Sequence, residues 1–213
     1  MGDEVGTSDW HGTIGRLAAW WLNSGFRRLA DVLVMGDGRS IVLHEISTIA
    51  GGDEVVLDLG AGSGYFSIPI AEMLESGKVL CLDLSEEMLS SLEHKAKRSG
   101  QWGRVEPVRR DAIDTGLQES SVDIVVSSNF MHELADPGKV ATEIARVLKP
   151  GGRLLVSDFR ASSTQGIVTS HHRGAHGPFS VGDMKALLLG AGLIDVTVET
   201  KRMMLVARAA MPG

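Results

Sequence analysis

The sequence predicts an α/β protein in which a doubly wound, mostly parallel sheet carries helices on both faces. From residue 54 onwards, continuous apolar runs alternate with amphipathic stretches, and a glycine-rich turn follows the first run. Apolar runs without strict alternation are typical of strands buried on both faces, and strands separated by helices form βαβ units. Ligands of such sheets bind beyond the carboxyl ends of the strands, so we expect the functional site there.

Seven strands are expected. Five are the apolar runs at 55–59, 78–84, 105–111, 122–128 and 153–159, and helices are expected near 65–76, 86–99, 137–148 and 181–190. The last two strands, 194–199 and 202–208, follow one another with no room for a helix. Because parallel neighbours need a long crossover connection, these two must pair as a hairpin, and one of them runs antiparallel.

The first fifty residues have a different pattern. Apolar positions within 13–35 have roughly helical spacing, which predicts two short helices broken near 23–25, and a third helix is expected over 41–49. Three tryptophans in this segment could form a lid over an apolar substrate, make a dimer contact or pack on the sheet: Trp10, Trp20 and Trp21.

Composition places the chain among ordinary globular proteins. It has 213 residues, 43% hydrophobic and 23% charged, and a formal net charge of -6, which suits one domain with a real core. The mildly acidic balance argues against a nucleic-acid backbone as the main partner. The single cysteine, Cys81, allows no disulfide within the chain and no cysteine-based zinc site. With no secretory signal and no apolar stretch long enough to span a bilayer, we expect a cytoplasmic protein without a membrane partner.

The glycine turn is the strongest local signal. Gly60, Gly62 and Gly64 lie between an expected strand and an expected helix, where glycines let the backbone approach a ligand and helix N–H groups face it. The alternative is a turn that serves only to reverse the chain. A dinucleotide fingerprint would need a glycine where Tyr65 stands, and Asp58 suits a ligand with an amino group better than a pyrophosphate.

Two further acids follow the second and third expected strands. Asp83 comes about twenty residues after the turn, where a carboxylate can accept both hydroxyl protons of a ribose. Asp111 would face the same crevice and could accept from an exocyclic adenine amine. Alternatively, both acids cap the helices that follow them.

In their order along the chain, these segments resemble a known group of enzymes. VVLDLGAGSGYFSIPIA, CLDLSEEML, RRDAID, VDIVVSSNFMHEL and RVLKPGGRLLVSDF resemble the motifs of class I S-adenosylmethionine-dependent methyltransferases, in particular the small bacterial and archaeal type 11 enzymes. The resemblance covers residues 53–208 and implies a Rossmann-like sheet of order 3-2-1-4-5-7-6 with the seventh strand antiparallel. It also implies that residues 53–213 bind the cofactor and that residues 1–52 form a helical segment covering the active site.

The resemblance assigns roles position by position. Asp58 would lie by the methionine end of S-adenosylmethionine, the three glycines beneath the cofactor and Tyr65 nearby. The remaining positions would contact the ribose (Asp83), the adenine (Leu84, Met88, Asp111 and the Ala112 N–H) and the methionine portion (Ser128 and Asn129). The product would be S-adenosylhomocysteine. Related arsenite methyltransferases use several cysteines, so the single Cys81 argues against that activity.

Histidines are the candidates for chemistry and for binding the acceptor. His132 follows the fourth expected strand and could take a proton from the attacking group, or only hydrogen-bond its loop; Glu133 is expected to cap a helix or face solvent. The loop 162–180 holds three more histidines that could line the substrate pocket, bind a metal or face solvent: His171, His172 and His176. Its glycines would break the helix that a metal site needs, so we expect no metal.

The predicted function is methyl transfer from S-adenosylmethionine to a small-molecule acceptor. The alternatives are a nicotinamide-dependent oxidoreductase on a similar fold and a non-catalytic cofactor-binding or regulatory module. A nucleic-acid or protein methyltransferase is a weaker possibility, because no basic stripe or appended recognition domain is evident. A homodimer remains possible.

Overall fold

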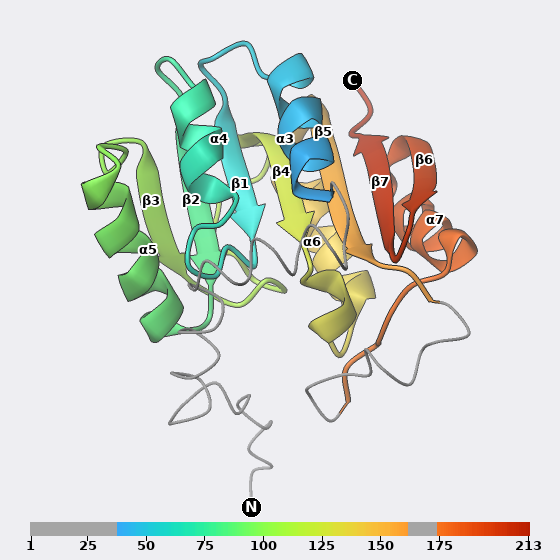
Figure 1. The fold of residues 1–213 in the computed structure, drawn as a ribbon. Helices are drawn as coiled ribbons and strands as arrows, with labels where there is room; N and C mark the ends of the chain where they lie inside the picture. Colours follow the sequence, from blue (N-terminus) through green and yellow to red (C-terminus); the bar gives the residue numbers. More distant parts are fainter. Residues whose placement is uncertain (1–37, 162–173) are drawn as a thin grey trace, which may run out of the picture.

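The computed structural model describes residues 38–161 and 174–213 (Figure 1). In chain order its elements are α3 (Gly38–Ile49), β1 (Val55–Leu59), α4 (Ser67–Met73), β2 (Lys78–Asp83), α5 (Glu86–Arg98), β3 (Val105–Arg109), β4 (Val122–Ser128), the 3-10 helix η2 (Met131–Glu133), α6 (Pro137–Val147), β5 (Leu148–Phe159), α7 (Val181–Gly190), β6 (Ile194–Lys201) and β7 (Met204–Ala210). The helices expected within 13–35 and the three N-terminal tryptophans lie outside the described residues.

The seven strands form one sheet in the order β3-β2-β1-β4-β5-β7-β6. The strands β1 to β5 are parallel to one another, and β7 pairs antiparallel with both β5 and β6. The doubly wound architecture, the strand order and the terminal hairpin are thus as predicted. Since β1 lies in the middle of the parallel part, its carboxyl end lies where the strand order reverses, which is the usual ligand position in this architecture.

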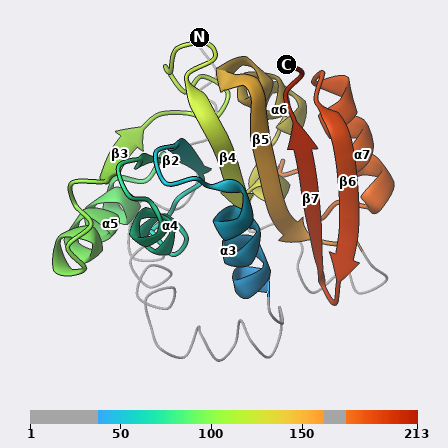
Figure 2. The ribbon, with the colours of Figure 1, turned by 90° about the horizontal axis from the view of Figure 1, so that it is seen from above.

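Helices cover both faces of the sheet, as Figure 2 shows in the view from above. Along β1, Leu57 and Leu59 pack into the hydrophobic cluster under α6 and α7. Val56, between them, belongs to the cluster under α3, α4 and α5. Successive strand residues point to opposite faces, so a nearly continuous apolar run is expected when both faces are covered.

Helix boundaries follow the local chemistry of the chain. The side chains of Ser85, Asp136 and Ser180 each accept a hydrogen bond from a backbone N–H in the first turn of α5, α6 and α7. Such N-caps satisfy donors that a helix leaves without an internal partner. Pro137 follows one cap at the start of α6, where its missing N–H costs nothing.

Several expected boundaries were displaced by a few residues. β5 begins at Leu148 rather than at 153, because the KPGG segment continues the strand, with an irregular register between Val122 and Ile124 of β4. The last strand lies two residues later than expected, because Arg202 adopts the left-handed conformation in the hairpin turn. β3 ends at Arg109, two residues early. Within the described residues, no helix combines the length and apolar character that crossing a membrane requires.

Candidate functional site

The glycine turn joins the end of β1 to α4 at the carboxyl edge of the sheet. The backbone N–H groups of Gly60 and Ala61 both donate to the Leu82 carbonyl oxygen on β2, each at 2.9 Å. Gly60 and Gly62 have φ angles of 76° and 52°, in the left-handed region that side chains disfavour. The turn is therefore fastened to the neighbouring strand in a conformation that requires glycine.

The surroundings of these two glycines differ. A Cβ atom on Gly60 would lie 2.5 Å from Cδ2 of Phe130, so the Phe130 ring packs directly on the turn. A Cβ atom on Gly62 would meet nothing within 4 Å among the described residues. Gly60 is thus enclosed by protein, whereas Gly62 presents bare backbone to open space.

Asp83, at the end of β2, faces that open backbone. Its Oδ2 accepts the Gly62 N–H at 2.8 Å, and its Oδ1 accepts the Ser85 N–H at 2.8 Å. Burial raises the pKa of Asp83, although three backbone hydrogen bonds oppose that rise. Ser85, not Asp83, is the side chain that caps α5. The carboxylate accepts from backbone N–H groups and keeps a lone pair for a ligand hydroxyl.

Asp58 lies deeper, at the fourth position of β1. It is 2% exposed, and its Oδ2 accepts the Ser67 Oγ–H at 2.5 Å. Burial raises its pKa to about 6; the Ser67 hydrogen bond opposes this, and the charge of Asp83 adds to it. Asp58 thus lies within the electrostatic reach of Asp83.

The beginning of α3 contacts the turn. The Arg39 guanidinium lies over the Tyr65 ring, 4.5 Å from its centroid, and Nη2 donates to the Tyr65 carbonyl oxygen at 3.3 Å. A cation over an aromatic face is attracted by the ring quadrupole. The helix that follows the undescribed N-terminal residues therefore starts beside the glycine turn.

Apolar side chains stand at the ends of β2 and β3. Leu84 is 57% exposed and Ile113 is 47% exposed, an unusual exposure for large hydrophobic residues after two adjacent strands. Asp111 is exposed and its Oδ1 accepts the Ile113 N–H at 3.1 Å, whereas Ala112 and Met88 are buried. Sequence reasoning did not single out Ile113.

The end of β4 carries two buried hydroxyls. Among the described residues, Oγ of Ser127 and Oγ of Ser128 have no hydrogen-bond partner. Asn129 follows with a φ of 54°, and its N–H donates to the Ser157 carbonyl oxygen at 2.8 Å. Buried polar atoms are nearly always satisfied, so these two hydroxyls at the carboxyl edge are candidates to bind a polar group of a ligand.

His132 forms a buried pair with Asp158. His132 Nδ1 lies 2.6 Å from Asp158 Oδ1, and the His132 backbone N–H donates to Oδ2 at 3.0 Å. A carboxylate can only accept, so Nδ1 carries a proton, and Nε2 is the acceptor nitrogen when the imidazole is neutral. Burial alone would lower the pKa of His132, but the hydrogen bond and charge of Asp158 raise it above its usual value. Asp158, on β5, was not anticipated from the sequence.

Glu133 contradicts its sequence-based expectation. Its side chain is only 29% exposed, and its Oε1 lies 3.9 Å from His132 Nε2. Burial raises the pKa of Glu133 to about 7; the positive charge of His132 opposes this, and Asp158 and Asp83 add to it. The prediction that Glu133 caps a helix or faces solvent was therefore wrong, because η2 turns it towards the other ionisable groups of the site.

The histidine loop is described only in part. His171 and His172 lie outside the described residues. The His176 N–H donates to the Leu134 carbonyl oxygen at 2.8 Å, and its ring stacks on Phe179 with centroids 4.2 Å apart. The segment that carries His176 thus pairs with the chain just after η2. In the part of the chain that the structure describes, no group of three metal-ligating side chains is found.

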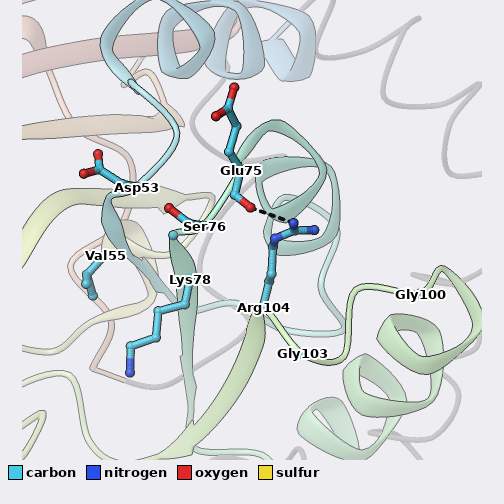
Figure 3. Close-up of a pocket in the computed structure, with 9 residues that line it drawn as sticks. Asp53, Val55, Glu75, Ser76, Lys78, Gly100, Gly103 and Arg104 are labelled. Atoms are coloured by element: carbon cyan, nitrogen blue, oxygen red, sulfur yellow. Dashed lines mark hydrogen bonds between the residues drawn. The ribbon is translucent and has the colours of Figure 1, made fainter.

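A cavity of about 640 Å³ opens at the opposite, amino-terminal edge of β1 to β3 (Figure 3). Its two basic groups are already engaged: Lys78 pairs with Glu106 at 2.9 Å, and Arg104 Nη2 donates to the Glu75 carbonyl oxygen at 2.7 Å. The glycine turn, Asp83 and His132 lie at the other edge of the sheet. We therefore assign the functional site to the carboxyl edge and no function to this cavity.

Comparisons with known proteins identify the relatives of this chain. A family model described as a methyltransferase domain matches residues 57–156. The ubiquinone/menaquinone biosynthesis C-methyltransferase UbiE of Escherichia coli O1:K1 / APEC is 35% identical over 107 residues, which cover 50% of this chain and 43% of that protein. The chain thus spans less than half the length of the curated relatives it matches.

Solved structures extend the similarity to the whole fold. A SAM dependent methyltransferase from Aquifex aeolicus superposes with a TM-score of 0.70 at 25% identity, covering 92% of this chain and 97% of that chain. A SAM-dependent methyltransferase from Methanosarcina mazei superposes with a TM-score of 0.67 at 20% identity, covering 79% of this chain and 97% of that one. At that lower identity, the second likeness shows the fold alone.

Proposed function

Since the chain belongs to the class I S-adenosylmethionine-dependent methyltransferases, we propose that it transfers the methyl group of this cofactor to a small-molecule acceptor. The observation that carries the proposal is the contact between Asp83 and Gly62. It joins the carboxylate that we propose to bind the ribose to the bare backbone of Gly62, where a Cβ atom would meet nothing among the described residues within 4 Å. A side chain at Gly62 would fill the space that a ligand needs.

The residues at the carboxyl edge fit the cofactor in three parts. Asp83 would accept the ribose hydroxyls, and the adenine would lie against Leu84 and Ile113, with Asp111 and the Ala112 N–H at its edge. The unsatisfied hydroxyls of Ser127 and Ser128 support a polar ligand group there, which we assign to the methionine portion. Asp58, Met88 and Asn129 complete this proposed binding set. When bound, the cofactor supplies a methyl group that its sulfonium has already activated.

His132 is the proposed proton acceptor. Asp158 fixes the imidazole with Nδ1 protonated, so Nε2 can take a proton from an acceptor whose attacking atom carries one. The resulting imidazolium would be stabilised by Asp158, which lies 0% exposed behind it. Much of the remaining catalysis is positioning of the acceptor against the methyl group.

The undescribed N-terminal residues are proposed to cover this site. Support comes from Arg39, which packs on Tyr65 beside the glycine turn and so brings the chain before α3 to the carboxyl edge. We likewise propose that His171 and His172 join His176 near the acceptor, since His176 hydrogen-bonds the residue after η2. The lone thiol of Cys81, fully buried in β2, suits a reducing compartment such as the cytoplasm.

Calorimetric titration with S-adenosylhomocysteine tests the proposal, with a nicotinamide dinucleotide as the control ligand. We expect S-adenosylhomocysteine to bind with a Kd of about 1 μM or tighter, and the dinucleotide not to bind. Asp83→Ala should weaken the binding of S-adenosylhomocysteine by about 2 kcal/mol, which is the cost of losing hydrogen bonds to a charged group. Tight binding of the dinucleotide would instead favour the oxidoreductase, and unchanged affinity in a folded Asp83→Ala variant would remove Asp83 from the site.

A non-catalytic cofactor-binding module would bind S-adenosylhomocysteine equally well. Release of labelled methyl groups from the cofactor into products of a cell extract distinguishes the enzyme from the module. We expect transfer, because a buried histidine held by a buried carboxylate has no evident use in binding alone.

A further inference from the structure

A carboxylate oxygen of Glu133 and the Nε2 atom of neutral His132 are two hydrogen-bond acceptors that lie near each other. Glu133 Oε1 and His132 Nε2 are 3.9 Å apart, which is too far for a direct hydrogen bond. With Nδ1 committed to Asp158, Nε2 is an acceptor when His132 is neutral, which is the form that a base requires. Among the described residues, the Glu133 carboxylate takes no hydrogen bond and pairs with no lysine or arginine. The gap between the two atoms suits a group that donates two hydrogens, one to each.

This geometry distinguishes between classes of acceptor. A phenol or alcohol carries one O–H and would satisfy either Glu133 or His132, leaving the other without a donor. A protonated amine carries two or more N–H groups on one atom and can satisfy both. Leaving a partly buried carboxylate without a donor costs free energy, so the pair favours the amine.

The charges around Glu133 favour the same class. The charged groups that act on its pKa are His132 from η2, Asp158 from β5 and Asp83 from β2. Together with Glu133 itself, these groups are three carboxylates and one imidazole. They would repel an acceptor that carries a carboxylate or a phenolate, and they would attract a cation. They would also offset the repulsion between an ammonium group and the positive sulfonium of the cofactor.

Resting on the proposed methyltransferase function, we propose that the acceptor is a small amine, held through its nitrogen between Glu133 Oε1 and His132 Nε2, and that this nitrogen is methylated. One ammonium proton passes to His132 Nε2, which frees the nitrogen lone pair. The nitrogen then forms a bond to the sulfonium methyl carbon. The carbon–sulfur bond breaks with its electron pair remaining on sulfur. The products are the N-methylated ammonium, neutral sulfur in S-adenosylhomocysteine and an imidazolium that later returns its proton to water.

Binding of matched probes to the full chain saturated with S-adenosylhomocysteine tests the proposal. The probes are butylamine, benzylamine and 2-phenylethylamine, each compared with the alcohol of the same carbon skeleton, and titrated by calorimetry at pH 7.5. We expect at least one amine to bind about tenfold or more tightly than its alcohol, and Glu133→Gln to abolish that preference. The neutral amide keeps the size of the side chain and loses its charge.

Two controls separate this proposal from the one on which it rests. Glu106→Gln removes an exposed carboxylate at the opposite edge of the sheet and should leave every affinity unchanged. Wild-type protein that binds S-adenosylhomocysteine but prefers none of the amines overturns the amine proposal alone, as does a preference that survives Glu133→Gln. Wild-type protein that fails to bind S-adenosylhomocysteine overturns both.

Discussion

The contact between Phe130 and Gly60 allows a quantitative test of why the turn needs two different glycines. Gly60→Ala and Gly62→Ala both place a Cβ atom at a left-handed φ, which costs about 1–2 kcal/mol each. Only the Gly60 variant also drives that atom into Phe130, 2.5 Å from Cδ2 and 2.8 Å from Cβ. Such overpacking adds about 1–3 kcal/mol.

We therefore expect the two variants to separate stability from binding. Gly60→Ala should lower the free energy of unfolding by about 2–5 kcal/mol, and Gly62→Ala by only about 1–2 kcal/mol. In contrast, Gly62→Ala should strongly weaken binding of S-adenosylhomocysteine, because its methyl group occupies the open space beside the Asp83 contact. Urea unfolding and calorimetric titration measure the two quantities on the same samples.

The steric origin is tested by a double-mutant cycle with Phe130→Ala. In that background, Gly60→Ala should cost only its backbone share, about 1–2 kcal/mol. The reasoning is refuted if the two glycine variants are equally stable, or if removing the ring leaves the cost of Gly60→Ala unchanged.

Two further predictions concern the buried ionisable groups. Burial raises the pKa of Asp58 to about 6, above its ordinary value of 3.8. Between these pH values the folded protein holds a proton that the unfolded chain has lost, so the free energy of unfolding falls as pH rises through this window. Above the window, the ionised Asp58 lowers the free energy of unfolding by about 3 kcal/mol. Asp58→Asn should therefore raise the free energy of unfolding at pH 7.5 and leave it nearly unchanged at pH 4, as measured in urea; a variant that is less stable at pH 7.5 contradicts this account. His132→Asn, which keeps a donor for Asp158, should retain binding of S-adenosylhomocysteine and lower methyl transfer about 100-fold or more. Turnover within twofold of wild type would exclude His132 as the base.

Local pattern was sufficient to predict most of the sheet. β1 and β4 have the expected bounds, because both faces of a central strand are buried and its residues are mostly apolar. β5 was expected to begin late, because the KPGG segment has the composition of a loop, yet its backbone pairs Leu148 with Val122. Composition alone does not reveal that the backbone of a polar segment pairs with a neighbouring strand.

The ionisable part of the site was less predictable. The sequence pointed to His132. Its partner Asp158 lies 26 residues away along the chain, near the end of an apolar run where no partner is expected. Glu133 was misjudged because exposure depends on how η2 packs against β5, which no local pattern encodes. Long-range pairs of this kind form only when the fold brings separate strand ends together, so they require the structure.

The division of the carboxyl edge between β1–β3 and β4–β5 has a consequence for redesign. The groups proposed to hold the cofactor lie mostly on the first half, whereas Glu133, His132 and Asp158 lie on the second. Exchanging side chains of the short η2 segment should therefore alter which nucleophile is accepted, while the β1–β3 half of the edge keeps its geometry. With this separation, the acceptor specificity can be changed without changing the cofactor-binding residues, provided that Phe130 still packs on Gly60.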